Sequence, residues 1–149
     1  MLTAENIMTS EVVTVQPQTE LKELAALFQK YNFSSMPVVD NQGDLYGIIT
    51  TTDLIDRDTT LHIPTVVSIF DWVLYLESEK NFEEQVRRIS AHKVAEICST
   101  AVITCAADTP VTEVAELMVK HKVHLVPVVA GKKILGVIAR LDIVRAMGV

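Results

Sequence analysis

The stretch MPVVDNQGDLYGIITTTD at residues 36–53 returns in altered form as VPVVAGKKILGVIARLD at residues 126–142. In both stretches two short apolar runs flank a turn that contains glycine, which is the pattern of a β-hairpin. An aspartate, Asp53 in the first stretch and Asp142 in the second, follows each hairpin and suits the N-terminus of a helix. We therefore expect two hairpins, each followed by a helix that begins at its aspartate.

The similarity between the two halves continues upstream of the hairpins. Residues 7–39 align with residues 97–129 at a constant offset of 90 positions, and one deletion in the hairpin turn changes the offset to 89. So many aligned identities with a single gap indicate an internal duplication. Before each hairpin, the β-branched runs Val12–Val15 and Val102–Thr104 predict a short strand.

A helix is predicted between this strand and the hairpin in each copy, because apolar residues recur there at i, i+3 and i+4. Thr19 and Thr109 are the expected N-caps, and Pro110 fits just inside the second helix. The apolar positions are Leu21, Leu24, Ala25, Leu27 and Phe28 in the first copy and Val111, Val114, Ala115, Leu117 and Met118 in the second. Each copy is thus a β-α-β-β-α unit of the α/β (α+β) class. One unit buries too little surface by itself, so the two are expected to pack through their sheets with pseudo-two-fold symmetry.

The chain divides into two repeats, residues 1–56 and 93–149, and a helical insert at residues 57–92. Within the insert, Thr65–Leu76 has a broad apolar face, and Asn81–His92 has the charge pattern of an exposed helix. Three roles for the apolar face stay open: part of the core, a dimer surface, or a membrane-surface helix. The acidic flanks disfavour the last of these.

Composition narrows the classes of function. The chain has 149 residues, 13 Lys and Arg against 19 Asp and Glu, and a formal net charge of −6, which argues against a nucleic-acid partner. No signal peptide and no apolar run long enough to span a membrane is visible, so a cytoplasmic location is expected. The histidines and the two cysteines have no metal-ligand spacing, and no catalytic motif is present. We expect no metal site, no catalytic residue and no enzymatic activity.

The motifs IMTSEVVTV, FSSMPVVD and GIITTTDL, together with KVAEICSTAVITC and HLVPVVAGKKILGVIARLDIV in the second half, resemble the CBS domain. CBS domains occur in pairs (Bateman modules), which usually dimerise into a flat disc. The resemblance implies a regulatory module that binds AMP, ADP, ATP or S-adenosylmethionine between its repeats, with no required cofactor, and that alters the activity of a partner. Because the chain ends just past the second repeat, the expected signal acts in trans on a separate, unknown protein target, and a homodimer is expected.

The resemblance also implies two ligand sites, in which the aspartate of one repeat completes a base pocket built by the other. Such an aspartate can accept hydrogen bonds from both ribose hydroxyls, and a neighbouring hydroxyl suits a phosphate. The first implied site comprises Thr50, Asp53, Ser99, Ile103, Val123, His124 and Pro127. The second comprises Asp142, Arg140, Thr9, Val13, Phe33, Ser34 and Pro37. The second site departs from the family pattern because Ala139 replaces the hydroxyl, and Arg140 is the candidate substitute as a phosphate ligand.

Simpler interpretations stay open at this point. Asp53 and Asp142 would also be explained as helix-terminal residues, Thr50 as a strand residue and His124 as a surface polar residue. A ligand-free assembly module is the main alternative function. An enzyme acting on nucleotides, with Asp53, His124 and Cys98 meeting in a cleft, is the remaining one. Titration with adenine ligands separates the sensor from the assembly module, and hydrolysis of added nucleotide with turnover, abolished in Asp53→Ala, would indicate the enzyme.

Overall fold

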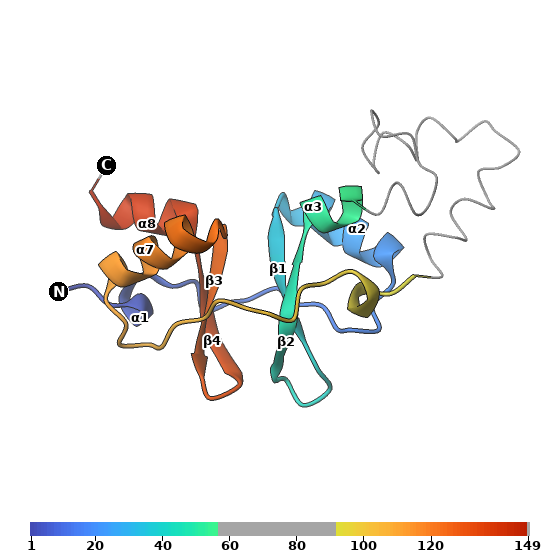
Figure 1. Ribbon diagram of the computed structural model, residues 1–149, viewed down its shortest axis with the longest axis horizontal. Coiled ribbons are helices and arrows are strands. Elements are labelled where there is room, and N and C mark those ends of the chain that lie inside the picture. The colour runs from blue at the N-terminus through green and yellow to red at the C-terminus, as the bar shows by residue number, and fades with distance from the viewer. Residues whose placement is uncertain (57–91, 149) are drawn as a thin grey trace, which may run out of the picture.

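The computed structural model describes residues 1–56 and 92–148, and it places two β-hairpins side by side with helices on their outer flanks (Figure 1). The predicted insert lies outside the described residues apart from His92. The first half contains α1 (Ala4–Ile7), α2 (Leu21–Tyr31), β1 (Ser35–Val39), β2 (Leu45–Thr50) and α3 (Thr51–Asp56). The second half contains the 3₁₀-helix η2 (Val94–Glu96), α7 (Val111–His121), β3 (Leu125–Ala130), β4 (Lys133–Ala139) and α8 (Arg140–Ala146).

Both predicted hairpins are confirmed, and they share one irregularity. β1 pairs antiparallel with β2, and β3 pairs antiparallel with β4. The register shifts between Val38 and Val39 in the first hairpin and between Val128 and Val129 in the second. Because these positions are equivalent in the repeats, the duplication seen in the sequence extends to the detail of strand pairing. β1 also contacts β3, so the two hairpins face each other across the centre of the molecule.

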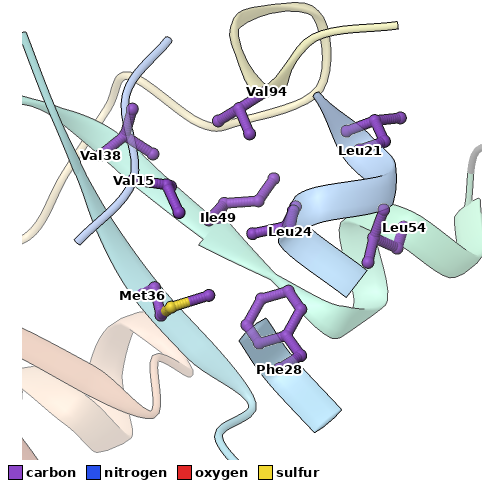
Figure 2. Close-up of a cluster of buried hydrophobic side chains, with 9 residues drawn as sticks. All are labelled: Val15, Leu21, Leu24, Phe28, Met36, Val38, Ile49, Leu54 and Val94. Carbon is purple, nitrogen blue, oxygen red and sulfur yellow. The ribbon is translucent and has the colours of Figure 1, made fainter. Parts of the chain in front are cut away.

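Each repeat has its own apolar core, and the first is shown in Figure 2. The amphipathic helix α2 buries Leu21, Leu24 and Phe28 against Met36 and Ile49 of the hairpin. The helix α7 buries Val114 and Met118 in the equivalent way. The predicted apolar faces of these helices are therefore confirmed, and each fixes one face of a hairpin so that the other face is free to line the space between repeats.

The two repeats exchange their N-terminal segments. Ala4 of α1 is fully buried in the core of the second repeat, where its N–H donates to the Thr109 carbonyl at 2.8 Å. Val94 of η2 is fully buried in the core of the first repeat, where its N–H donates to the Thr19 carbonyl at 2.9 Å. Neither core is complete without a segment from the other repeat, so the two copies form one structural unit.

The prediction of a first strand at Val12–Val15 and at Val102–Thr104 is wrong, because neither segment forms a regular strand. Val15 makes a single parallel bridge to Val38, and Cys105 makes one to Val128. Residues 8–15 lead from α1, which packs in the second repeat, to the first repeat, and residues 97–105 lead from η2, which packs in the first repeat, to the second; we call them the crossing segments. In this protein, a run of β-branched residues with extended backbone therefore indicates a segment that crosses between the repeats and not a β-strand.

Predicted helix starts also need correction. The N-caps of α2 and α7 are Glu20 and Pro110, one residue after the predicted Thr19 and Thr109. The two threonine hydroxyls instead accept the N–H of Gln16 and Ala106, each at 3.0 Å, and so close the preceding turns. The last helix of each repeat was expected to begin at Asp53 or Asp142.

These last helices begin two residues earlier, at Thr51 and at Arg140. Each aspartate therefore occupies the third helical position, from which its side chain reaches back to the start of the helix. Within the described residues, no helix combines the length and apolar character needed to cross a membrane.

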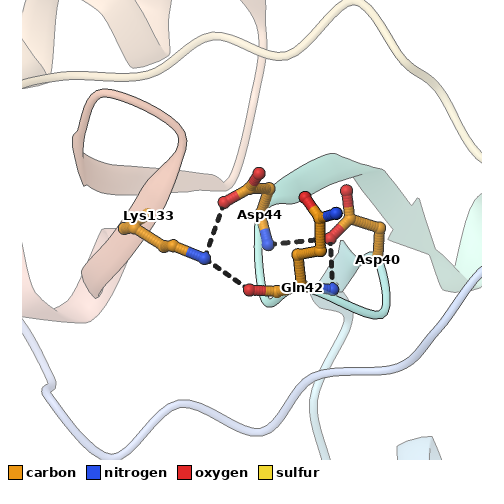
Figure 3. A network of polar contacts seen from close by, with 4 residues as sticks. All are labelled: Asp40, Gln42, Asp44 and Lys133. Atoms are coloured by element: carbon orange, nitrogen blue, oxygen red, sulfur yellow. Dashed lines mark hydrogen bonds and ion pairs between the residues drawn. The ribbon is translucent and has the colours of Figure 1, made fainter.

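The turns of the two hairpins also contact each other (Figure 3). The ammonium of Lys133 lies 2.8 Å from a carboxylate oxygen of Asp44 and also donates to the Gln42 carbonyl. Asp40 holds the first turn in shape, since its carboxylate accepts the N–H groups of Gln42 and Asp44. The Leu45 N–H donates to the Lys132 carbonyl at 2.8 Å. These contacts join the two hairpins at their tips, on the side away from the helices.

Candidate functional site

Two cavities of similar size lie between the repeats. One has a volume of about 450 Å³ and contains Asp53 at its edge, and we call it the Asp53 cleft. The other has a volume of about 430 Å³ and contains Asp142, and we call it the Asp142 cleft. Both volumes are within the range of small-molecule sites. Each cleft is lined by residues of both repeats.

The crossing segments build one wall of each cleft. Ser99 pairs with Ile48 of β2 through two backbone hydrogen bonds of 2.9 Å. Thr9 pairs with Val137 of β4 in the same way, at 2.9 and 3.0 Å. Ser99 lines the Asp53 cleft and Thr9 lines the Asp142 cleft. Each crossing segment thus delivers a hydroxyl of one repeat to the aspartate of the other.

Glycine is required where these segments pass. A Cβ added to Gly47 would lie 2.5 Å from the Ser99 carbonyl oxygen, closer than atoms can approach. A Cβ added to Gly136 would lie 2.6 Å from the Met8 sulfur and 2.8 Å from the Thr9 carbonyl oxygen. The glycine of each GII or GVI motif therefore allows a neighbouring backbone to approach the sheet.

Thr50 and Asp53 bond reciprocally at the start of α3. The Thr50 N–H donates to Asp53 Oδ2 at 2.9 Å, and the Asp53 N–H donates to Thr50 Oγ1 at 3.1 Å. This is a capping box, which orients both side chains. A hydroxyl that accepts one hydrogen bond still has a proton to donate, and a carboxylate oxygen pair can accept several more. The two groups are therefore held in place and retain capacity for a ligand.

The Asp142 cleft has half of this arrangement. The Ala139 N–H donates to Asp142 Oδ2 at 2.8 Å, but Ala139 has no hydroxyl to offer in return. Arg145, one helical turn later, lies with a guanidinium nitrogen 3.6 Å from Asp142 Oδ1. The Asp142 side chain is 12% exposed and that of Arg145 is 74% exposed, so the carboxylate is largely buried and its arginine partner lies mostly in solvent.

The remaining wall of each cleft follows from how α2 and α7 end. Asn32 and Lys122 both adopt a left-handed backbone with φ of 55°, which ends the helix and turns the chain toward the cleft. In the Asp142 cleft the turn presents Phe33, whose ring stacks on Tyr31 at 5.4 Å between centroids. In the Asp53 cleft the equivalent residue is the smaller Val123.

A model of the CBS domain family matches residues 4–59 and residues 94–149. The chain belongs to the CBS domain family. The protein MJ1426 of Methanocaldococcus jannaschii is 26% identical over 151 residues, which cover 96% of this chain and 89% of that protein. MJ1404 of the same organism is 27% identical over 139 residues, which cover 93% of this chain but 30% of MJ1404. The chain thus matches most of MJ1426 but less than a third of MJ1404.

Among solved structures, the CBS domain pair of protein MJ0100, in complex with 5′-methylthioadenosine and S-adenosyl-L-methionine, matches with a TM-score of 0.73. It is 26% identical, and the match covers 99% of this chain and 97% of that one. The expected fold, a tandem pair of CBS repeats, is therefore confirmed.

The structure brings together nearly all the side chains that the CBS resemblance implied. Six of the seven residues of the first implied site line the Asp53 cleft; the exception is Pro127, which is buried and whose carbonyl accepts the Cys105 N–H at 3.0 Å. All seven residues of the second implied site line the Asp142 cleft. Whether these residues bind a ligand stays a prediction.

Several lining residues were not anticipated from the sequence. Lys122 lines the Asp53 cleft, and Glu11, Tyr31 and Arg145 line the Asp142 cleft; Arg140, which was predicted for the second site alone, lines both clefts. Arg145 had a usable signal, because it follows Asp142 by three residues on a helix. The sequence has no comparable signal for Lys122 and Tyr31, because their positions depend on where α7 and α2 end.

The enzyme alternative placed Asp53, His124 and Cys98 in one cleft. Asp53 and His124 do line the same cleft, but Cys98 is not among its lining residues. Burial, and next the Asp53 carboxylate, raise the pKa of the Cys98 thiol above its ordinary value. The thiol is therefore protonated at neutral pH, which is the poorly nucleophilic form. Within residues 1–56 and 92–148, no group of three His, Cys, Asp or Glu side chains is placed to hold a metal ion.

Proposed function

We propose that the protein is a regulatory sensor that binds an adenine-containing ligand in the Asp53 cleft. The observation that carries this proposal is the pair Thr50 and Asp53, held by mutual hydrogen bonds at the edge of a cavity of about 450 Å³. The carboxylate would accept the two ribose hydroxyls, and the Thr50 hydroxyl would donate to a phosphate. Ile103 and Val123 supply apolar surface for a base.

The CBS pair of MJ0100 supports this choice of ligand class, since it was solved with two adenosyl compounds. The Asp142 cleft is the second proposed site, with Thr9, Val13, Phe33, Ser34 and Pro37 around Asp142 and Arg140. AMP, ADP, ATP and S-adenosylmethionine are the candidate ligands. We propose a binding function and no catalysis, with regulation of a separate protein in trans.

Isothermal titration calorimetry with each of the four ligands tests the proposal. At least one should bind with a dissociation constant below 1 mM (about −4 kcal/mol or better), and Asp53→Asn should weaken it about tenfold or more, because a hydrogen bond to a charged group is lost. The matched control is Asp108→Asn, which removes the same charge from an exposed residue outside both clefts. If none of the four ligands binds at millimolar concentration, the sensor proposal is wrong and the ligand-free assembly module takes its place.

A homodimer is also proposed. Apolar side chains are exposed on α7, on α8 and just after α8, notably Val119 at 80%, Leu141 at 63% and Met147 at 69%. A second copy that covers this surface would remove it from water. Sedimentation velocity of the wild-type protein and of Val119→Lys tests this. A dimer that persists unchanged in the variant would place the contact elsewhere, and a wild-type monomer would overturn the proposal.

A further inference from the structure

The two clefts meet at the centre of the molecule, where five residues line both of them. Four of the five form two pairs related by the duplication: Ser34 with His124, and Ser35 with Leu125. Arg140 is the fifth, and it breaks the symmetry. Its equivalent in the first repeat is Thr51, which lines the Asp53 cleft alone.

Arg140 is also the one permanently charged residue at this junction among the described residues. Lys122 lines the Asp53 cleft and not the Asp142 cleft, whereas Arg145 lines the Asp142 cleft and not the Asp53 cleft. Arg145 forms an ion pair with Asp142. Arg140 has an exposed side chain, and no ion pair of its guanidinium is found within residues 1–56 and 92–148.

We propose that Arg140 is a shared anion ligand that couples the two clefts negatively. The inference rests on the proposed function, because it requires that both clefts accept the adenine ligand. A phosphate in either cleft would draw the same guanidinium toward it, since a bidentate contact to phosphate is the strongest that arginine makes. A second phosphate in the other cleft would then lack this guanidinium as a ligand, because it is bound to the first phosphate. The second phosphate would also be repelled by the negative charge of the first.

The consequence is a dependence on ligand charge. Two neutral nucleosides fill the clefts independently, whereas two nucleotides do not. The Asp53 cleft retains the Thr50 hydroxyl and Lys122 as further groups for a phosphate. The Asp142 cleft lacks the hydroxyl because of Ala139, so it depends on Arg140 more heavily. With AMP, the Asp53 cleft fills first and the Asp142 cleft is the one weakened.

Calorimetric titration with AMP and with adenosine provides the test, using wild type and the single-cleft variants Asp53→Asn and Asp142→Asn. The affinity of the Asp142 cleft for AMP should be lower in wild type than in Asp53→Asn, by about fivefold or more. A factor of this size is typical of coupling between two sites. Adenosine should show no such difference. Added salt should reduce the difference for AMP, because it screens charges at this range.

Arg140→Thr provides the decisive variant, since threonine is the residue that the first repeat has at this position. This variant should weaken the binding of AMP in both clefts. It should also make the AMP affinity of the Asp142 cleft the same whether or not Asp53 is replaced by asparagine. Lys122→Asn is the matched control: it also removes one cation, and the first repeat has asparagine with the same left-handed backbone at this position. It should weaken AMP in the Asp53 cleft alone and preserve the coupling.

Three outcomes would overturn the inference. AMP isotherms of wild type that equal the sum of the two single-cleft isotherms, AMP binding to one cleft alone in every background, or coupling that persists in Arg140→Thr would each remove Arg140 as the shared ligand. Each of these leaves the proposed adenine binding in place. Absence of binding by both AMP and adenosine overturns the proposed function and the inference together.

Discussion

The Asp53 cleft and the Asp142 cleft have the same backbone and different chemistry. Both are walled by a crossing segment, floored by a hairpin and edged by the start of a short helix. The Asp53 cleft has a complete Thr50–Asp53 capping box and an aliphatic wall. The Asp142 cleft has an alanine at the cap, a stacked aromatic pair and an arginine over its carboxylate. Duplication preserved the positions that pack and left free those that face the clefts.

The largest expected effect concerns the glycines that admit the crossing segments. Gly47→Ala should destabilise the fold by about 2–3 kcal/mol, because the obstacle is the backbone carbonyl of Ser99. Gly136→Ala should cost about 1–2 kcal/mol, because its nearest obstacle is the flexible Met8 side chain and its backbone obstacle, the Thr9 carbonyl oxygen, lies farther away at 2.8 Å. Urea denaturation of both variants measures the difference. Equal losses would mean that the two crossings are equally rigid.

The next effect separates the two aspartates. Asp53→Asn should lower the total affinity for AMP more than Asp142→Asn does, because the Asp53 cleft also holds Thr50 and Lys122. The expected loss for Asp53→Asn is about tenfold or more. Equilibrium dialysis with AMP compares the variants directly. A larger loss in Asp142→Asn would reverse the ranking of the clefts.

Restoring the missing hydroxyl is a smaller change that should make the clefts more alike. In Ala139→Thr the new hydroxyl can accept the Asp142 N–H, as Thr50 does for Asp53, and raise stability by about 0.5–1 kcal/mol. AMP should also bind the Asp142 cleft more tightly. Thermal denaturation and AMP titration measure the two effects. Ala139→Val offers the matched control, because valine has nearly the shape of threonine but no hydroxyl.

The smallest effect is expected at the hairpin turns, which lie away from both clefts. Lys133→Met removes the ion pair with Asp44 and the hydrogen bond to the Gln42 carbonyl. The Lys133 side chain is 58% exposed, so the loss should be about 0.5 kcal/mol and should decrease further at high salt. Chemical denaturation at low and high salt checks this. A loss several times larger would mean that the turns, and not the cores, set the spacing of the hairpins.

Sequence reasoning succeeded where a signal is local or repeated. The hairpins and the apolar faces of α2 and α7 follow from periodicity, and the pairing of halves follows from the duplication. Helix starts were displaced by one or two residues because the side chain of Thr19 closes the turn before α2 and that of Asp53 reaches back from inside α3. Val12–Val15 was taken for a strand because extended backbone and paired strand share the same residue preferences.

A candidate site residue could be predicted from the sequence where the family motif includes its position. Asp53 and Asp142 could be named because each follows a recognisable hairpin. Pro127 is implied by the motif but is buried and does not line the Asp53 cleft, although its equivalent Pro37 lines the Asp142 cleft. Tyr31 reaches the Asp142 cleft through the end of α2, which periodicity locates only roughly.

The amino-acid order alone was sufficient for the repeat, the hairpins and the unequal caps Thr50 and Ala139, because each is a property of neighbouring residues. The exchange of N-terminal segments depends on three-dimensional packing, since α1 and η2 complete cores of the opposite repeat. The same is true of the position of Arg140 between two clefts. Such contacts join residues that are far apart in the chain, and nothing local in a sequence records which distant surface a segment will cover.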